Sequence, residues 1–216
     1  MGAVLTTSRY LLNAMKRICF GLLILFPLAG ASAIDFTPRY AESVQDGFPV
    51  KRLFFADQDQ RIYLSVPNNW RVTGDGQHGA FTPGNLTQAS IVLENSPIGA
   101  QIAFDEKGLA AYRKAASESM PPGASEIQIE FERTNEVRLN GWTSFEMTFS
   151  YKSYGQRFTK SVLFINLDKE KQILFLVEAR KENYEKLYQQ ARATLGSWFA
   201  PSPELESVLQ RLSAKN

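Results

Sequence analysis

The sequence predicts a single α+β domain organised around the stretch from Asn140 to Trp198. Residues 142–151 alternate between apolar and polar side chains, which is typical of a half-buried strand. Residues 157–167 and 172–180 are apolar at consecutive positions, so both faces of these two strands must be partly covered. Residues 184–198 then repeat apolar side chains at helical spacing. The stretch therefore predicts three long strands closed by one helix.

Shorter elements precede that stretch. Residues 34–50 show no clear period, and we interpret them as an extended arm laid over the domain of residues 51–200. Residues 51–56 and 61–66 are two short apolar runs around a polar turn, which favours a hairpin. Residues 71–88 are rich in glycine and proline, so we expect a loop there with one brief strand.

Three further elements lie between that loop and Asn140. Residues 89–94 predict a strand, and Asp105 is a good N-cap for a helix. The inner side chains of this helix are expected to be Leu109, Tyr112, Ala116 and Met120. Residues 126–133 alternate and predict another strand, and residues 136–139 continue this strand region. Its inward side chains are expected to be Ile127, Ile129 and Phe131. The dipeptide Asn140-Gly141 favours a hairpin turn before the long strands.

An amphipathic helix is predicted over residues 201–216. Ser202 can cap this helix, and Pro203 suits its first position. Its apolar stripe consists of Leu205, Val208, Leu209 and Leu212. Two interpretations stay open, because the stripe can pack back on the domain or dock a protein partner.

Residues 1–33 have the pattern of a secretory signal peptide. A basic pair precedes an apolar run over residues 18–29, and small residues follow up to Ala33, so we expect cleavage after Ala33. The run is shorter than the ~20 residues of a bilayer span, so no transmembrane segment is expected after cleavage. Translation can start at Met1 or at Met15.

Cleavage changes the charge and the cysteine content of the chain. The full chain has 24 Lys and Arg against 22 Asp and Glu, but the signal contains three basic residues and no acid. The remaining 21 basic and 22 acidic side chains argue against nucleic acid as a partner. Cys19 is the single cysteine, so the exported chain contains no disulfide and no thiolate. Export without disulfides fits the bacterial periplasm.

The candidate chemical motifs have simpler structural explanations. His78 is the single histidine and has no triad-like partner near it in the sequence. Asp57-x-Asp59 opens like a calcium loop but lacks the glycine of that loop. The glycine string from Gly74 to Gly79 is not followed by the helix that a dinucleotide site needs. We therefore expect no catalytic residue, no cofactor and no metal ion.

The residues left for recognition flank the glycine-rich segment and belong to the last helix. Trp70 is the tryptophan best suited to binding, because it stands directly beside the predicted loop. The candidate recognition surface consists of Trp70, Arg71, His78, Phe81, Leu205 and Leu209.

The order of these parts resembles the PsbP/Mog1-like superfamily, including its bacterial DcrB-type members. The motifs that carry the resemblance are Val66-Pro67-x-x-Trp70, Ala80-Phe81-Thr82-Pro83, Asn140-Gly141-Trp142 and Ser197-Trp198-Phe199. The resemblance covers residues 53–199 and implies an antiparallel β-sheet sandwiched by helices. It also implies binding or adaptor roles without catalysis. The arm of residues 34–50 and the last helix depart from the family pattern.

These features together predict an exported, non-enzymatic binding or adaptor protein of the bacterial cell envelope, with a protein partner. The alternative is a carrier of a small ligand or lipid, with a pocket between the sheet and residues 71–88. A hydrolase that uses carboxylates such as Asp57 and Asp59, together with His78, is the most distant alternative.

Overall fold

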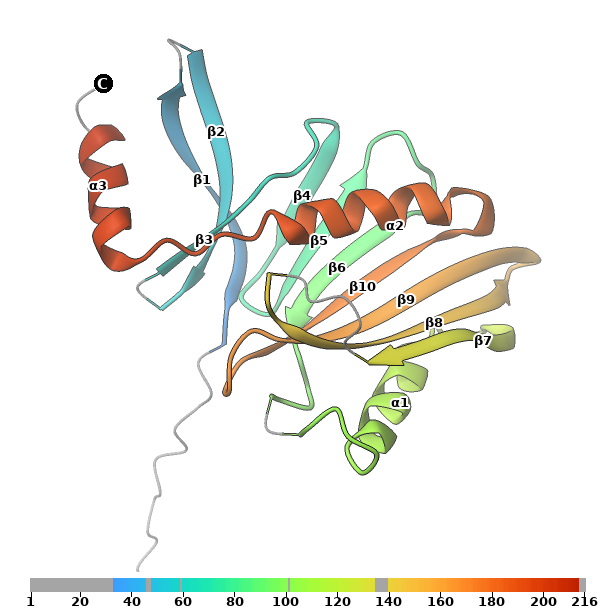
Figure 1. Ribbon diagram of the computed structural model, residues 1–216. Helices are drawn as coiled ribbons and strands as arrows, with labels where there is room; N and C mark the ends of the chain where they lie inside the picture. Colours follow the sequence, from blue (N-terminus) through green and yellow to red (C-terminus); the bar gives the residue numbers. More distant parts are fainter. Residues whose placement is uncertain (1–32, 46–47, 59, 101, 135–139, 214–216) are drawn as a thin grey trace, which may run out of the picture. The chain divides into compact units, whose positions relative to one another are not determined.

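The computed structural model describes residues 33–45, 48–58, 60–100, 102–134 and 140–213. The predicted signal peptide therefore lies outside the described residues, apart from Ala33. Among them, two antiparallel sheets account for most of the regular structure (Figure 1). The smaller sheet consists of β1 (Asp35–Gln45), β2 (Phe48–Asp57) and β3 (Gln60–Leu64), in that order.

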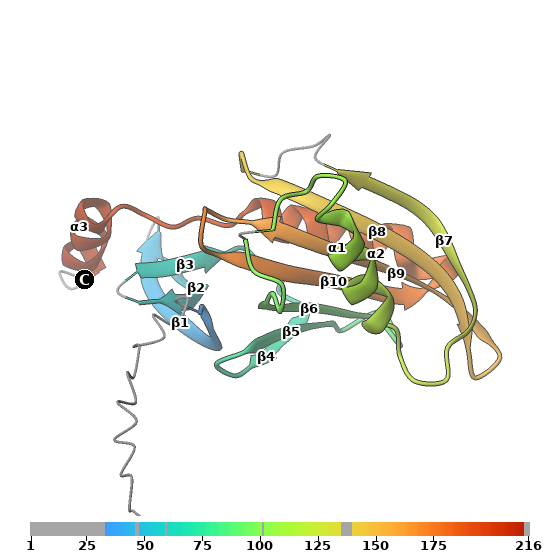
Figure 2. The same cartoon turned by 90° about the horizontal axis from the view of Figure 1, so that it is seen from below.

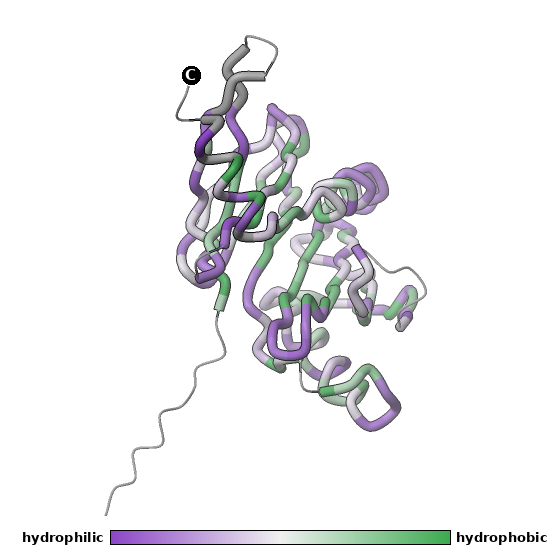
Figure 3. The backbone as a smooth tube through the Cα atoms, turned by 60° about the vertical axis from the view of Figure 1, so that its left-hand side comes forward, coloured by the Kyte–Doolittle hydropathy of each residue, from purple (hydrophilic) through white to green (hydrophobic). Residues whose placement is uncertain are grey.

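The larger sheet has seven strands, and all its neighbours are antiparallel. Its strands are β4 (Trp70–Gly74), β5 (His78–Pro83), β6 (Ser90–Asn95), β7 (Ser125–Thr134), β8 (Thr143–Ser153), β9 (Gln156–Asn166) and β10 (Gln172–Arg180). Their order in space is β4-β5-β6-β10-β9-β8-β7, so β9 and β10 are central. The three long strands predicted between residues 142 and 180 are confirmed, and the sheet's strands carry long hydrophobic stretches (Figure 3).

Helices cover both faces of the larger sheet, as the two-sided apolar strands require. Helix α2 (Lys181–Gly196) follows β10 directly and lies across one face, while α1 (Leu109–Glu118) lies on the opposite face (Figure 2). The core under α2 includes Leu163, Phe175, Leu187 and Leu195, and the core under α1 includes Tyr112, Ala116, Phe145 and Phe164. The predicted α+β fold, an antiparallel sheet between helices, is confirmed.

The start of α1 lies later than the sequence suggests. Asp105 Oδ1 accepts hydrogen bonds from the backbone N–H groups of Lys107 and Gly108, at 3.1 and 2.9 Å, so it closes a turn. The helix itself begins at Leu109, with Gly108 at the N-cap. A Cβ at Gly108 would lie 1.9 Å from the carbonyl oxygen of Ala103, which explains the glycine at this place.

The predicted extended arm of residues 34–50 is instead a paired strand and the beginning of a second one. Strand β1 pairs with β2 from Asp35 opposite Ala56 to Gln45 opposite Phe48. A register shift between Asp35 and Arg39 interrupts the ladder. Because a bulge breaks the two-residue alternation, no strand period is visible in this part of the sequence.

The predicted loop of residues 71–88 contains the β4–β5 hairpin instead. The glycines of this hairpin let the backbone of β1 pack closely against it; they do not mark a flexible loop. A Cβ at Gly74 would lie 2.4 Å from the carbonyl oxygen of Phe36, and a Cβ at Gly79 would lie 3.3 Å from the ring of Phe55. The glycines therefore belong to a packing contact between the two sheets.

Strand β7 exposes the side chains that the sequence assigns to the core. Ile127, Ile129 and Phe131 are 48, 59 and 39% exposed, so the prediction that they point inward is wrong. The strand is an edge of the larger sheet and pairs with β8 alone, and two register shifts interrupt that pairing. Helix α1 contributes Tyr112 and Ala116 to the core over the inner strands. The predicted continuation at residues 136–139 lies outside the described residues.

Replacing Gly74 by Ala is expected to lower the free energy of unfolding by about 1–3 kcal/mol, because backbone atoms of Phe36 and His78 must move away from the new methyl group. Gly76→Ala is the matched control, since its nearest neighbour would be Asp35 Oδ1 at 3.9 Å. The control should change stability by less than about 0.5 kcal/mol. Urea denaturation measures both values, and equal stability of the two variants would contradict the close crossing.

Candidate functional site

An open cleft beside Trp70 is the candidate site. Its volume is about 430 Å³. We call it the Trp70 cleft, and its lining residues are Tyr40, Lys51, Arg52, Leu53, Leu64, Ser65, Val66, Pro67, Asn68, Trp70 and Val72. They come from β1, β2, β3, β4 and the connection between β3 and β4. The cleft thus lies where the smaller sheet meets the edge strand of the larger one.

The cleft exists because β3 is short. Strand β3 pairs with β2 only from Leu53 opposite Leu64 to Asp57 opposite Gln60. The chain then turns away, since a proline at position 67 has no N–H to continue a ladder. The N–H of Trp70 donates to the carbonyl of Pro67 at 3.0 Å and closes this turn. Strands β1 and β2 continue past the end of β3 as a two-stranded ribbon (Figure 1).

Trp70 presents a hydrogen-bond donor that the described part of the chain does not use. Its side chain is 7% exposed and packs in the core with Phe81 and Leu64. The indole Nε1 is buried, and no acceptor among the described residues lies within hydrogen-bond distance. A buried donor without an acceptor costs free energy, so such a group is usually satisfied by water or by a ligand.

The charges that line the cleft are positive. Lys51 and Arg52 are exposed, and the lining contains no acidic residue. Lys51 Nζ lies 3.2 Å from Glu42, but both side chains are 70% exposed, so this pair is weak. Arg52 makes no ion pair with any residue whose side chain the structure describes. The cleft therefore offers two cations beside apolar side chains.

The predicted recognition residues do not form one surface. Trp70 lines the cleft, and Arg71 is exposed on the next position of β4. Phe81 is 1% exposed and belongs to the core, so it cannot contact a partner directly. Leu205 is 42% exposed on the last helix, and the side chain of Leu209 lies outside what the structure describes.

His78 begins β5, between two carboxylates. Its Nδ1 lies 3.4 Å from Asp75 Oδ1, and its Nε2 lies 3.5 Å from Glu94 Oε2. Backbone N–H groups of Gln77 and His78 hold the pKa of Asp75 below its usual value, whereas burial raises the pKa of Glu94. Asp57, the other member of the hydrolase hypothesis, forms an ion pair with Lys171 at 2.7 Å. Asp59 lies outside the described residues.

The last helix, α3 (Pro203–Ser213), meets the smaller sheet through a polar contact. Glu206 is buried, accepts a hydrogen bond from the Tyr63 hydroxyl at 3.3 Å and lies 3.3 Å from Arg61 Nε. Leu205 and Val208 of the predicted apolar stripe are 42 and 46% exposed. The helix is therefore held to β3, while two of its apolar side chains remain available to a partner.

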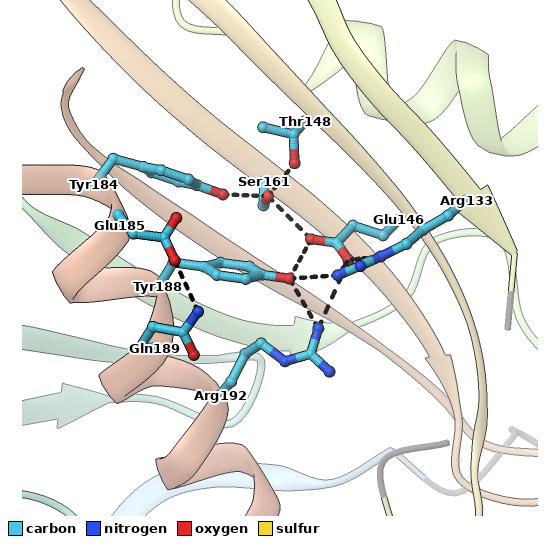
Figure 4. A network of polar contacts seen from close by, with 9 residues as sticks. All are labelled: Arg133, Glu146, Thr148, Ser161, Tyr184, Glu185, Tyr188, Gln189 and Arg192. Carbon is cyan, nitrogen blue, oxygen red and sulfur yellow. Dashed lines mark hydrogen bonds and ion pairs between the residues drawn. The ribbon is translucent and has the colours of Figure 1, made fainter. Parts of the chain in front are cut away.

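A second polar cluster lies beneath α2 (Figure 4). Glu146 on β8 accepts hydrogen bonds from Arg133 Nη2 at 2.6 Å, from the Tyr188 hydroxyl at 2.6 Å and from the Ser161 hydroxyl at 3.2 Å. The side chain of Glu146 is 4% exposed. Burial, followed by the charge of Glu146, raises the pKa of Tyr188 to about 12. The cluster ties β7, β8, β9 and α2 together, which is a structural role.

Sequence reasoning missed the two cations of the cleft. Lys51 and Arg52 stand 18 and more positions before Trp70 and reach it only through the meeting of the two sheets. The one local signal was the break at Val66-Pro67, which ends β3 early.

Among the described residues, no group of acidic, histidine or cysteine side chains could hold a metal ion. Nor is any described helix long and apolar enough to cross a membrane.

Several solved structures are similar to this chain. No protein-family model and no curated protein matches it. LpqN of Mycobacterium tuberculosis, described as involved in cell envelope biogenesis, is 13% identical over 76% of this chain and 92% of its own, with a TM-score of 0.46. PsbP (CyanoP) of Synechocystis is 12% identical over 80% and 95%, with a TM-score of 0.42. The Ran-binding protein Mog1p of Saccharomyces cerevisiae is 13% identical over 83% and 95%, with a TM-score of 0.37.

The similar structures thus include a PsbP and a Mog1p. The likeness concerns the fold alone, because the identities are 12–13% and the TM-scores are low. It carries no information on the partner or activity of this chain.

Replacing Glu146 by Gln is expected to lower the free energy of unfolding by about 3 kcal/mol, because it leaves Arg133 without its buried counter-charge. Glu132→Gln is the control. It removes a more exposed partner of Arg113 on the same edge of the sheet and should leave the unfolding midpoint nearly unchanged. Thermal denaturation followed by circular dichroism compares the two, and a harmless Glu146→Gln would contradict the structural role of the cluster.

Proposed function

We propose that this protein is an exported, non-enzymatic binding or adaptor protein of the bacterial cell envelope, and that the Trp70 cleft is its binding surface. The proposal rests on the combination of side chains that line this cleft. Two exposed cations and several apolar side chains converge on one concave site, beside a tryptophan whose buried indole N–H has no acceptor among the described residues. Such convergence of a few polar groups on an apolar concavity is typical of binding sites.

Export is supported by the sequence. Residues 16–33 have the basic start, apolar run and small-residue ending of a secretory signal. The chain after Ala33 contains no cysteine, which suits an envelope compartment where disulfides would otherwise form. A protein partner is supported by the open shape of the cleft, and by Leu205 and Val208, which α3 leaves exposed.

A carrier of a small ligand or lipid is the second candidate. The volume of the cleft, about 430 Å³, falls within the usual range of ligand pockets and favours this function as well. The two functions differ in what the cleft binds. A carrier retains a ligand of low mass, whereas an adaptor contacts another polypeptide at the cleft.

Photo-crosslinking in living cells tests the proposal. Tyr40 lines the cleft and is 54% exposed, so its replacement by benzoylphenylalanine places a crosslinker at the site. The same replacement at Tyr154, which is fully exposed on the β8–β9 turn, is the matched control. We expect one crosslinked protein at position 40, none at position 154, and loss of the product when Arg52→Glu is added.

Two results would decide against an adaptor. Equal crosslinking at both positions, or none at position 40, would contradict the cleft as a protein-binding surface. Native mass spectrometry of the protein released from the envelope then separates the remaining cases. An added mass of a few hundred daltons indicates a carrier, and the bare mass removes that function too.

A further inference from the structure

We infer that the cleft binds an extended, acidic segment of a protein partner, which adds to the smaller sheet as a strand in line with β3. This inference rests on the proposed function and specifies the chemistry of the partner. It follows from the pairing of β2 and from the charged and apolar side chains of the cleft.

The pairing of β2 differs along its length. On one side, β1 accompanies it from Phe48 to Ala56. On the other side, β3 pairs only with Leu53–Asp57. The segment Phe48–Arg52 therefore has no strand on that side among the described residues, and we call that side the open edge. A row of unpaired backbone groups at such an edge is a template for another strand.

The cleft lies over the face of the smaller sheet where Tyr40, Leu53 and Leu64 stand side by side, and it reaches the open edge at Lys51 and Arg52. Lys51, Arg52 and Leu53 of β2 form one wall, and the connection from Ser65 to Asn68 forms another. A strand that continued the direction of β3 would lie between these walls. Five residues of the open edge correspond to about 17 Å of extended chain. A partner segment of five to seven residues would therefore fill the site.

The charges select the partner. Lysine and proline at a sheet edge normally discourage indiscriminate pairing, and the open edge contains both Lys51 and Pro49. A strand with Lys or Arg at these positions would meet like charge. Lys51 and Arg52 are adjacent in β2, so their side chains point to opposite faces of the sheet. Asp or Glu on the face of Arg52 would instead form an ion pair with it, so the charge that discourages random pairing also favours an acidic partner.

The remaining lining suits the other features of a strand. Alternate side chains of an added strand point to one face, where Leu53, Val66 and Val72 provide apolar contacts. Trp70 lines the cleft as well, but its indole Nε1 is buried, so the residue offers a strand its ring and not its N–H group. Each property of the cleft thus has a counterpart in an acidic, alternating strand.

The exposed edge at β7 is less suited to this role, although Ile127 and Ile129 are exposed there. Two register shifts interrupt that strand, and bulges at an edge prevent regular pairing. Two of its glutamates already contact Lys152 and Arg113. The open edge of β2 has a continuous register opposite β1 from Arg39 onward.

Two pools of fluorescent heptapeptides test the inference on the exported chain. Both pools alternate Val, Ile, Phe or Tyr with charged residues, which are Asp or Glu in one pool and Lys or Arg in the other. Fluorescence anisotropy is expected to show at least tenfold tighter binding of the acidic pool. Arg52→Glu should abolish this preference, whereas Arg157→Glu, a control at an exposed position of β9 outside the cleft, should preserve it.

Backbone methylation distinguishes strand addition from a charge contact alone. In the tightest acidic peptide, N-methylation at one set of alternate residues should weaken binding at least tenfold, because those N–H groups pair with β2. Methylation of the other set should change binding by less than about twofold, because those groups face away from β2. Equal effects of both sets, an equal affinity of the two pools, or no binding of either pool would overturn the inference.

The outcome separates this inference from the proposed function. A crosslinked partner at position 40 without preference for acidic peptides would overturn strand addition alone. If no partner is crosslinked, the adaptor function fails regardless of how the peptides behave.

Discussion

The close crossing of β1 over the β4–β5 hairpin is the constraint on which the rest of the structure depends. Gly74 and Gly79 lack the side chains that would keep the backbone of β1 away. The rings of Phe36 and Phe55 fill the contact edge to face, with centroids 5.2 Å apart. At the start of β1, Asn95 exchanges two hydrogen bonds with the backbone of Ile34, at 2.9 and 3.0 Å. These contacts fix the smaller sheet against the larger one and thereby place the wall of the cleft beside Trp70.

Further contacts hold the smaller sheet at its other end. Tyr63 on β3 and Phe199, after α2, exchange backbone hydrogen bonds of 2.8 and 3.0 Å. Lys171, in the turn between β9 and β10, binds Asp57 at the end of β2. The part of the smaller sheet that contains β3 is therefore tied to the core, whereas the segment of β2 before Leu53 pairs, among the described residues, with β1 alone. Binding at the open edge uses the part of the sheet that the core does not already occupy.

The sequence predicted the fold well where a strong period spans a long segment, and less well elsewhere. Strands β8 to β10 and helix α2 were located because their apolar patterns are long and regular. The β4–β5 hairpin was mistaken for a loop because Gly74 and Gly79 serve a tertiary contact that leaves no local signal. The alternating pattern correctly predicted strand β7, but it wrongly placed Ile127 and Ile129 in the core. Hydrophobic periodicity does not indicate whether a strand lies at the edge of its sheet. Likewise, Trp70 was identified from its neighbours in sequence, but Lys51 and Arg52 reach it only in the folded chain.

The open edge of β2 is the central claim, and hydrogen exchange of the free protein, measured by NMR, tests it most directly. A strand with neighbours on both sides protects every amide, whereas a strand with one neighbour protects every second amide. We predict slow exchange at the amides of Leu53 and Phe54, where β1 and β3 both pair with β2. Between Val50 and Arg52, slow and fast amides should alternate. Uniformly slow exchange from Val50 to Arg52 would contradict the open edge and with it the account of the cleft.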